Sequence, residues 1–240
     1  MVLLDVQKAF DCVDHDILCQ KLTALGISST GWFKSYLSNR RQIVNINGTQ
    51  SQEKVITSGV PQRSILGPTL FLCYVNDMPS SVNCRLIQYA DDSVLIASDK
   101  DHSKISQLLS DNLKNCDQWL IENKLSVHMG KTELILFGSK RKLKRVPNFS
   151  ITHRGTTVKS TSEVKYLGLK IDQNLSGSNI AMDIISKSNS RLKYLYRQAE
   201  NLNKQTKKTL CSALIGSSFD YSISSWYHGI SNPLREKTFK

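Results

Sequence analysis

The stretch Leu86–Ser98, LIQYADDSVLIAS, decides how this chain of 240 residues is interpreted. It is almost wholly apolar, yet it holds two adjacent carboxylates, Asp91 and Asp92, at its centre. Apolar runs of this length are typical of buried strands, and two neighbouring buried charges are costly unless something neutralises them. We therefore expect two short strands that flank a turn at Ala90–Asp92, with both carboxylates at the edge of a sheet.

Two interpretations of this pair are open. Asp is common in turns, so the pair taken alone favours a solvated hairpin turn. Carboxylates are also the ligands that Mg²⁺ prefers, and a third one on a neighbouring strand would allow two ions roughly 3.5–4 Å apart, the arrangement used for phosphoryl transfer. Asp5, inside the apolar segment LLDV, is the candidate third ligand. The alternative for Asp5 is a position exposed by fraying.

Charge is distributed unevenly along the chain. The net charge is +12, but residues 1–120 hold 11 Lys and Arg against 12 Asp and Glu, whereas residues 121–240 hold 21 against 8. This asymmetry suits a protein that holds metal ions in one half and a polyanion in the other, and it is equally compatible with a solvated basic surface. No apolar run approaches ~18 residues, which argues against a membrane span. The six cysteines form no CxxC pair, which favours reduced, intracellular thiols.

Hydrophobic periodicity and turn signals predict a mixed α+β fold with a boundary near residue 175. An Asn-Gly pair predicts a hairpin between two of the strands, and KRKLKR at 140–145 is expected to be a basic loop. Strands are expected at 2–6, 41–47, 52–57, 132–137 and 164–171, and helices at 15–27, 32–37, 64–77, 101–123, 179–199 and 203–216.

Five segments carry a family resemblance. In order they are LLDVQKAFDCVDHDIL (3–18), SGVPQRSILGPTLFLCYVND (58–77), QYADDSVLIA (88–97), NKLSVHMGKTELILF (123–137) and VKYLGLKID (164–172). In this order and at these separations they resemble the five core motifs of reverse transcriptases, specifically those of non-LTR (LINE-type) retrotransposons. TLCSALIGSSFDYSISSWYHG (209–229) resembles the start of the thumb region.

The resemblance implies a right-hand polymerase palm over residues 1–175 and a partial helical thumb over 176–240. It implies an RNA-directed DNA polymerase that adds deoxynucleotides to a primer 3′-hydroxyl by two-metal phosphoryl transfer. By motif position, Asp5, Asp91 and Asp92 are the catalytic carboxylates that hold two Mg²⁺ ions, or Mn²⁺, together with the backbone carbonyl of Val6. One ion would activate the 3′-hydroxyl, and the other would neutralise the leaving pyrophosphate.

The resemblance also assigns residues to the nucleotide and to the primer. Phe10 matches the bulky residue that excludes a ribose 2′-hydroxyl, and its alternative is a plain core aromatic. Gln62 matches a glutamine near the incoming nucleotide. Lys131 matches a lysine proposed to protonate pyrophosphate, and a salt-bridged or solvated lysine is the alternative. Tyr89 is expected to support the primer end. The basic helix at 203–216 is expected to contact primer and template through Lys204, Lys207 and Lys208.

Three features depart from the family pattern. The second motif has Arg63 where the family has glycine, so this side chain either contacts a template or primer phosphate or obstructs and strains the site. His128 stands where asparagine is usual. The fingers subdomain expected before the first motif is missing, which predicts a fragment. The expected partners are an RNA template, a DNA primer and deoxynucleoside triphosphates, with no membrane and unknown protein partners, in the nucleus, the cytoplasm or both.

Two other functions are compatible with parts of this pattern. A non-catalytic nucleic-acid-binding remnant would use the basic second half without turnover. A nuclease could place the same carboxylates around two metal ions. The second and fifth motifs argue against a nuclease, because it has no need of a nucleotide-selecting Phe10 or Gln62.

Overall fold

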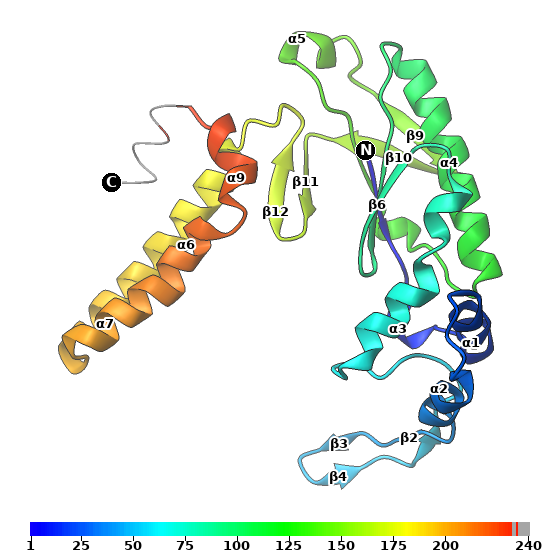
Figure 1. The fold of residues 1–240 in the computed structure, drawn as a ribbon. Coiled ribbons are helices and arrows are strands. Elements are labelled where there is room, and N and C mark those ends of the chain that lie inside the picture. The colour runs from blue at the N-terminus through cyan, green and yellow to red at the C-terminus, as the bar shows by residue number, and fades with distance from the viewer. Residues whose placement is uncertain (232–233, 235–240) are drawn as a thin grey trace. The chain divides into compact units, whose positions relative to one another are not determined.

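A central antiparallel sheet organises the α+β fold, which is seen here in a computed structural model that describes residues 1–231 and 234 (Figure 1). Within those residues the sheet has six strands in the order β6-β7-β1-β8-β10-β9, so that the first strand of the chain lies in its interior. The strands are β1 (Val2–Asp5), β6 (Arg85–Tyr89), β7 (Asp92–Ile96), β8 (Glu133–Ile135), β9 (Ser150–His153) and β10 (Thr156–Thr161).

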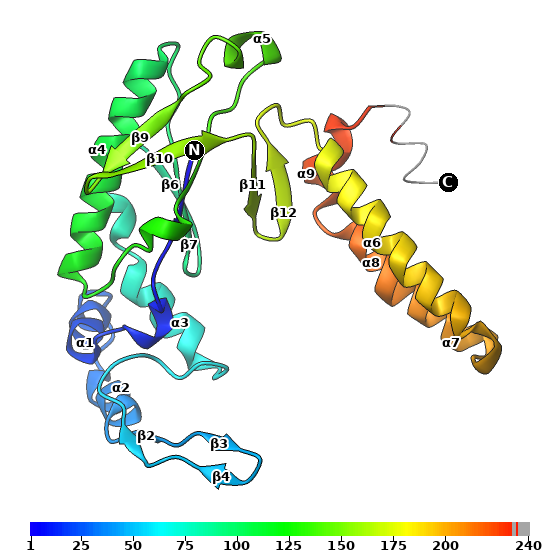
Figure 2. The same cartoon turned by 180° about the vertical axis from the view of Figure 1, so that it is seen from behind.

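Helix α4 (His102–Glu122) lies along one face of this sheet, as Figures 1 and 2 both show. Its apolar stripe, which includes Leu109, Leu113 and Leu120, is fully buried. The helix is also fixed to the β9–β10 hairpin, because the buried carboxylate of Asp117 accepts hydrogen bonds from His153 and Arg154. The expected helix at 101–123 is thereby confirmed.

A polar network joins α4 to α1 (His15–Ala24) and α3 (Leu66–Val75). The Lys21 ammonium forms an ion pair with Asp77 and lies 4.5 Å from the centre of the Trp119 ring. The Tyr74 hydroxyl donates to the carbonyl of Asn123 at 2.6 Å, and burial, as the main cause, raises the pKa of that hydroxyl to about 12. These contacts hold three helices together beneath the sheet edge where the site described below lies.

A small hairpin follows α2 (Thr30–Leu37) and extends away from the sheet in both views. Its turn is Asn47-Gly48, with φ angles of 51° and 88°, so both residues have the left-handed conformation that a tight hairpin turn needs. The Asn-Gly prediction is therefore confirmed. The paired strands are short: β2 (Arg41–Gln42), β3 (Asn45–Ile46), β4 (Thr49–Gln50) and β5 (Lys54–Val55).

The chain forms two compact units, one of residues 1–134 and 148–160 and one of residues 135–147 and 161–240. In the second unit Ile180, Ala181, Ile184, Trp226 and Ile230 form a buried cluster. Its elements are α5 (Lys140–Leu143), β11 (Glu163–Tyr166), β12 (Leu169–Asp172), α6 (Ser178–Arg197), α7 (Lys204–Cys211), α8 (Ser217–Asp220) and α9 (Ile223–Trp226). The assignment of 1–175 to a palm and 176–240 to a thumb stays a prediction, and part of the latter range lies outside the described residues.

Three details differ from the sequence-based expectations. The expected strand at 164–171 is a hairpin, because Leu167 and Gly168 have positive φ angles of 46° and 83°. The expected basic loop contains one helical turn, α5, which the Ser139 side chain caps. The β9–β10 hairpin turns at Arg154 and Gly155 and was not predicted, since its short polar strands carry little apolar alternation.

Short helical turns connect these elements. Two of them adjoin the site described below, namely the 3₁₀ turns at Ala9–Asp11 and Met129–Lys131. The others are 3₁₀ turns at Met78–Ser81, Ala199–Asn201 and Tyr227–Gly229 and a π turn at Ser212–Gly216.

The segment Ser58–Val60 is hydrogen-bonded to the chain that follows β1. Gly59 N–H donates to the carbonyl of Val13 at 2.7 Å, and Val60 N–H donates to the carbonyl of Phe10 at 2.8 Å. Gly59 has a φ of 91°, and a Cβ there would lie 2.8 Å from the carbonyl oxygen of Asp11. Both the conformation and the space therefore require glycine.

We expect Gly59→Ala to lower the free energy of unfolding by about 3 kcal/mol, because it adds a backbone clash to a left-handed alanine. Gly26→Ala is the matched control, since Gly26 has a φ of 85° but no atom within 4 Å of the added Cβ. The free energy of unfolding of the control should fall by only about 1 kcal/mol. Urea unfolding curves of both variants measure the difference, and equal losses would show that the contact with Asp11 is not tight.

Candidate active site

The pairing of β1 with β7 brings the expected carboxylates together. Asp5 and Asp92 are direct partners across these antiparallel strands, and Asp91 lies in the tight turn between β6 and β7. Ala90, in the same turn, has a positive φ of 53°. The two strands predicted on either side of Ala90–Asp92 are confirmed. Asp5 belongs to the strand and its side chain is one-third exposed, so it is not frayed.

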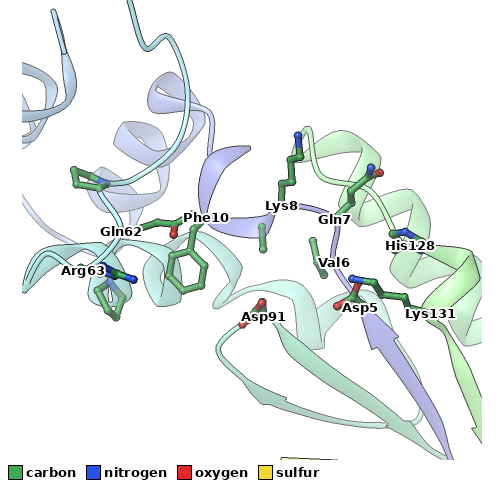
Figure 3. Close-up of a pocket in the computed structure, with 13 residues that line it drawn as sticks. Asp5, Val6, Gln7, Lys8, Phe10, Gln62, Arg63, Asp91, His128 and Lys131 are labelled. Carbon is green, nitrogen blue, oxygen red and sulfur yellow. The ribbon is translucent and has the colours of Figure 1, made fainter. Parts of the chain in front are cut away.

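A cavity of about 640 Å³ opens beside these strands (Figure 3). It is formed by the segment after β1, the segment before α3, the β6–β7 turn and the turn before β8. Of the residues predicted from the motifs, the cavity is lined by Asp5, Val6, Phe10, Gln62, Arg63, Asp91 and Lys131.

The other predicted residues lie elsewhere. Asp92 and Tyr89 are not among the residues that line the cavity, although they face each other across the β6–β7 pair at its edge. Tyr89 is 65% exposed. Lys204, Lys207 and Lys208 are exposed on α7, in the other compact unit. The first unit therefore holds a single candidate centre, and the basic helix is a separate feature.

The carboxylates repel one another in this arrangement. The pKa of Asp92 is raised above its usual value, first by partial burial and then by the negative charges of Asp91 and Asp5. The Lys131 ammonium lies 3.3 Å from Oδ2 of Asp5 and offsets part of this repulsion. Lys131 is therefore salt-bridged, as one of the two alternatives expected. It also lines the cavity, and its role as a proton donor stays a prediction.

The donor set fits a hard cation, although the side chains are not gathered around one. Three carboxylates and a backbone carbonyl, with no thiolate or imidazole, are ligands that suit Mg²⁺ or Mn²⁺. Among residues 1–231 and 234, however, no three acidic, histidine or cysteine side chains converge on one point. Ion binding would require Asp5 to turn from Lys131 and the three carboxylates to approach each other.

Phe10 and Gln62 form one wall of the cavity (Figure 3). The Phe10 ring stacks on Phe71 of α3, with ring centroids 4.5 Å apart, so it is at once a core contact and part of the cavity wall. The side-chain amide of Gln62 donates to Oδ1 of Asp11 at 2.7 Å. Both side chains are thereby held in place by residues that do not themselves line the cavity.

Arg63 has a left-handed backbone, with φ at 59°. Glycine adopts this conformation freely. In an arginine the same conformation is unfavourable, because its Cβ lies too close to the following carbonyl oxygen. This gives a physical reason for the glycine at this position in the family motif. Arg63 also lines the cavity, so it adds a cationic side chain to the cavity wall.

Six residues that the sequence reasoning did not assign to the site also line the cavity: Gln7, Lys8, Ala9, Pro61, Pro68 and His128. Lys8 follows β1 with a φ of 46° and is one of these lining residues. His128, noted in the sequence only as a departure, donates its backbone N–H to the carbonyl of Asp5 at 2.8 Å. Its Nδ1 atom is buried without a hydrogen-bond partner. The available signal was the position of these residues within the first, second and fourth motifs.

We expect Arg63→Gly to raise the free energy of unfolding by up to about 1 kcal/mol, because relief of left-handed strain exceeds the added flexibility of the unfolded chain. Arg40 lies in a loop and does not have a positive φ, so Arg40→Gly is the control and should lower the free energy of unfolding. Urea unfolding measures both. A destabilised Arg63→Gly variant would mean that the arginine side chain makes contacts worth more than the strain.

We expect Asp92→Asn to stabilise the folded chain at pH 7 without divalent ions. The folded state raises the pKa of this carboxyl, so its ionisation becomes destabilising as the pH rises from the unfolded value of about 3.9 through the folded value. Thermal unfolding at low salt should show a higher Tm for the variant at pH 7 and no difference below about pH 3.5. Asp111→Asn, exposed on α4, is the control and should leave the Tm unchanged; an equal rise there would contradict the repulsion.

The family model and the related proteins that match this chain all point to the same protein family. Residues 1–171 match the family described as reverse transcriptase (RNA-dependent DNA polymerase). The chain is 33% identical over 184 residues to the probable RNA-directed DNA polymerase from transposon BS of Drosophila melanogaster, which covers 73% of this chain and 20% of that protein. It is 30% identical to the RNA-directed DNA polymerase from mobile element jockey of Drosophila funebris, with 72% of this chain and 19% of that protein covered.

A solved structure shares the fold. The telomerase of Candida tropicalis, solved in complex with a TWJ fragment of telomeric RNA, superposes with a TM-score of 0.50 at 12% identity, over 98% of this chain and 41% of that one. The chain spans about a fifth of the length of the curated relatives named above. Its ordered motifs and the match over residues 1–171 agree with the predicted likeness to non-LTR retrotransposon proteins: this chain belongs to the reverse transcriptase (RNA-dependent DNA polymerase) family.

Proposed function

We propose that this chain acts in RNA-directed DNA synthesis, as the palm and part of the thumb of a retrotransposon polymerase. The observation that carries the proposal is the direct pairing of Asp5 with Asp92, next to Asp91 and at the rim of a cavity lined by Phe10 and Gln62. Paired carboxylates beside a cavity of this size suit a nucleoside triphosphate whose phosphates are held at the sheet edge.

Asp5, Asp91, Asp92 and the carbonyl of Val6 would hold two divalent ions in this function. When bound, Mg²⁺ or Mn²⁺ makes a primer hydroxyl more acidic and balances the charge of the phosphates. The protein's own part is to keep the carboxylates close in spite of their repulsion. That repulsion, which raises the pKa of Asp92 after the effect of its burial, is the driving force for taking up cations.

Three side chains in the cavity would select and process the nucleotide. The Phe10 ring, fixed by Phe71, would occupy the space of a ribose 2′-hydroxyl and so favour a deoxynucleotide. Gln62, anchored on Asp11, would face the incoming base and sugar. Lys131 would give a proton from Nζ to the leaving pyrophosphate once its ion pair with Asp5 opens.

The expected partners are an RNA template, a DNA primer and deoxynucleoside triphosphates, with Tyr89 and Arg63 near the primer and template. Lys204, Lys207 and Lys208 on α7 would bind phosphates of the template–primer duplex. Among the residues that the structure describes, no helix is long and apolar enough to span a membrane. This function would be exercised inside the cell, in the nucleus, the cytoplasm or both.

A non-catalytic nucleic-acid-binding role is the second candidate. The left-handed Arg63 and its side chain in the cavity favour it, because they oppose entry of a nucleotide without affecting the basic helix α7. In this role the carboxylates would be dispensable, and affinity for nucleic acid would fall steeply with rising salt.

Primer extension separates the two candidates. With an RNA template, a DNA primer, Mg²⁺ and deoxynucleotides, we expect extension that Asp91→Asn lowers by about a thousandfold or more, since a charge needed in the transition state is removed. Asp111→Asn is the matched control and should keep full activity. Extension that is indifferent to Asp91→Asn would contradict the polymerase proposal. No extension, together with binding that survives Asp5→Asn, selects the binding role.

A further inference from the structure

Helix α2 and the loop that follows it carry a column of stacked planar side chains. The rings of Trp32 and Tyr36 are parallel within 3°, with centroids 5.5 Å apart. The guanidinium of Arg40 lies over the Tyr36 ring, with its central carbon 5.7 Å from the ring centre. Phe33 meets the Trp32 ring edge-on at 5.0 Å and holds its plane. The spacing of four residues places Trp32 above Tyr36 along the helix, whereas Arg40 reaches the Tyr36 ring from the loop that follows α2.

The outer end of the column faces solvent. Trp32 is 55% exposed, whereas the chain's other two tryptophans, Trp119 and Trp226, are 7% and 1% exposed. Helix α2 is anchored through Leu37, which is fully buried, so Trp32 is not needed to cover the core. A large aromatic ring held rigidly at the surface is typical of a binding site rather than of a stabilising contact.

The surroundings of the column are positively charged. Residues 30–57 contain Lys34, Arg40, Arg41 and Lys54 against a single acid, Glu53. Part of this charge is balanced, because Lys34 lies 3.6 Å from Asp16 and Arg41 lies 3.0 Å from Glu53. None of Trp32, Tyr36 and Arg40 lines the cavity of Figure 3, so this surface is distinct from the candidate active site. Flat rings that alternate with cations match a ligand that carries flat apolar groups and negative charges.

We propose that this column is a stacking platform for unpaired bases of single-stranded RNA. A base would stack on the exposed part of the Trp32 ring, while adjacent phosphates would meet the cations of the α2 and hairpin segment. Bases in a duplex are already stacked on their neighbours and cannot take this place. The inference rests on the proposed function for the choice of RNA, since a template strand is unpaired before it is copied.

Tryptophan fluorescence of the full chain tests the platform directly, because Trp32 is its one well-exposed tryptophan. Titration with an oligouridine strand should quench the fluorescence to saturation. Trp32→Ala should remove most of the quenching and weaken the affinity, measured with a labelled strand, by about 5- to 150-fold, the loss expected for one stacked base. The slope of log affinity against log salt should not change, because the ring carries no charge.

Two variants control this measurement. Trp32→Phe keeps a stacking ring and should retain most of the affinity. Ile46→Ala removes a 67% exposed apolar side chain from the neighbouring hairpin and should leave RNA binding unaltered. If Trp32→Ala binds RNA as tightly as the unmodified chain, or weakens duplex and single-stranded binding equally, the inference is wrong. Loss of self-association with unchanged RNA affinity would likewise overturn it and assign the surface to a protein contact.

The test of the stacking platform can fail or succeed independently of the test of the polymerase function. Asp91→Asn abolishes extension in the proposed function but should leave oligouridine binding and the quenching unchanged. A chain that fails to extend a primer yet shows Trp32-dependent binding would refute the polymerase function and keep the platform. A chain that extends a primer, but whose RNA affinity does not depend on Trp32, would refute the platform and keep the polymerase function.

Discussion

The antiparallel pairing of β1 with β7 is the constraint on which the rest of the site depends. It sets Asp5 opposite Asp92 and brings the β6–β7 turn, with Asp91, to the end of the first strand. The register of the paired strands keeps the backbones of these three residues close, and their side chains would still have to turn towards one another to share an ion. The sheet therefore supplies the stability, and the carboxylates represent a local cost that a cation would remove.

Backbone strain gathers around the same cavity. Lys8, Arg63 and Ala90 all have positive φ angles, and each lies within or beside one of the segments that form the cavity or its rim. Left-handed conformations of residues other than glycine persist only where the surrounding structure imposes them, and they are often found at functional sites. Two backbone hydrogen bonds, from Gly59 to Val13 and from Val60 to Phe10, fix the path of the chain between Lys8 and Arg63. The fold thus holds the cavity walls in a shape that these residues would not adopt by themselves.

Much of the fold followed from local patterns. The helix at 101–123, the Asn47-Gly48 hairpin and the strands around Ala90–Asp92 were predictable, because their signals lie within a few neighbouring residues. The segment 164–171 was wrongly taken as one strand, since a left-handed leucine before Gly168 is not visible in a hydrophobicity pattern. The β9–β10 hairpin was missed because its short strands carry little apolar alternation, and its buried His153 contacts Asp117 of a distant helix.

The sequence by itself determined the order of the motifs, the identity of the carboxylates and the imbalance of charge between the two halves, because these are properties of residue type and spacing. Only the tertiary structure decided which residues meet. It joined Lys131 to Asp5, Gln62 to Asp11 and Phe10 to Phe71, placed Lys8 and His128 in the cavity, and left Asp92 and Tyr89 off its wall. Contacts between residues far apart in the chain depend on how strands pair and helices pack, and no local pattern carries that information.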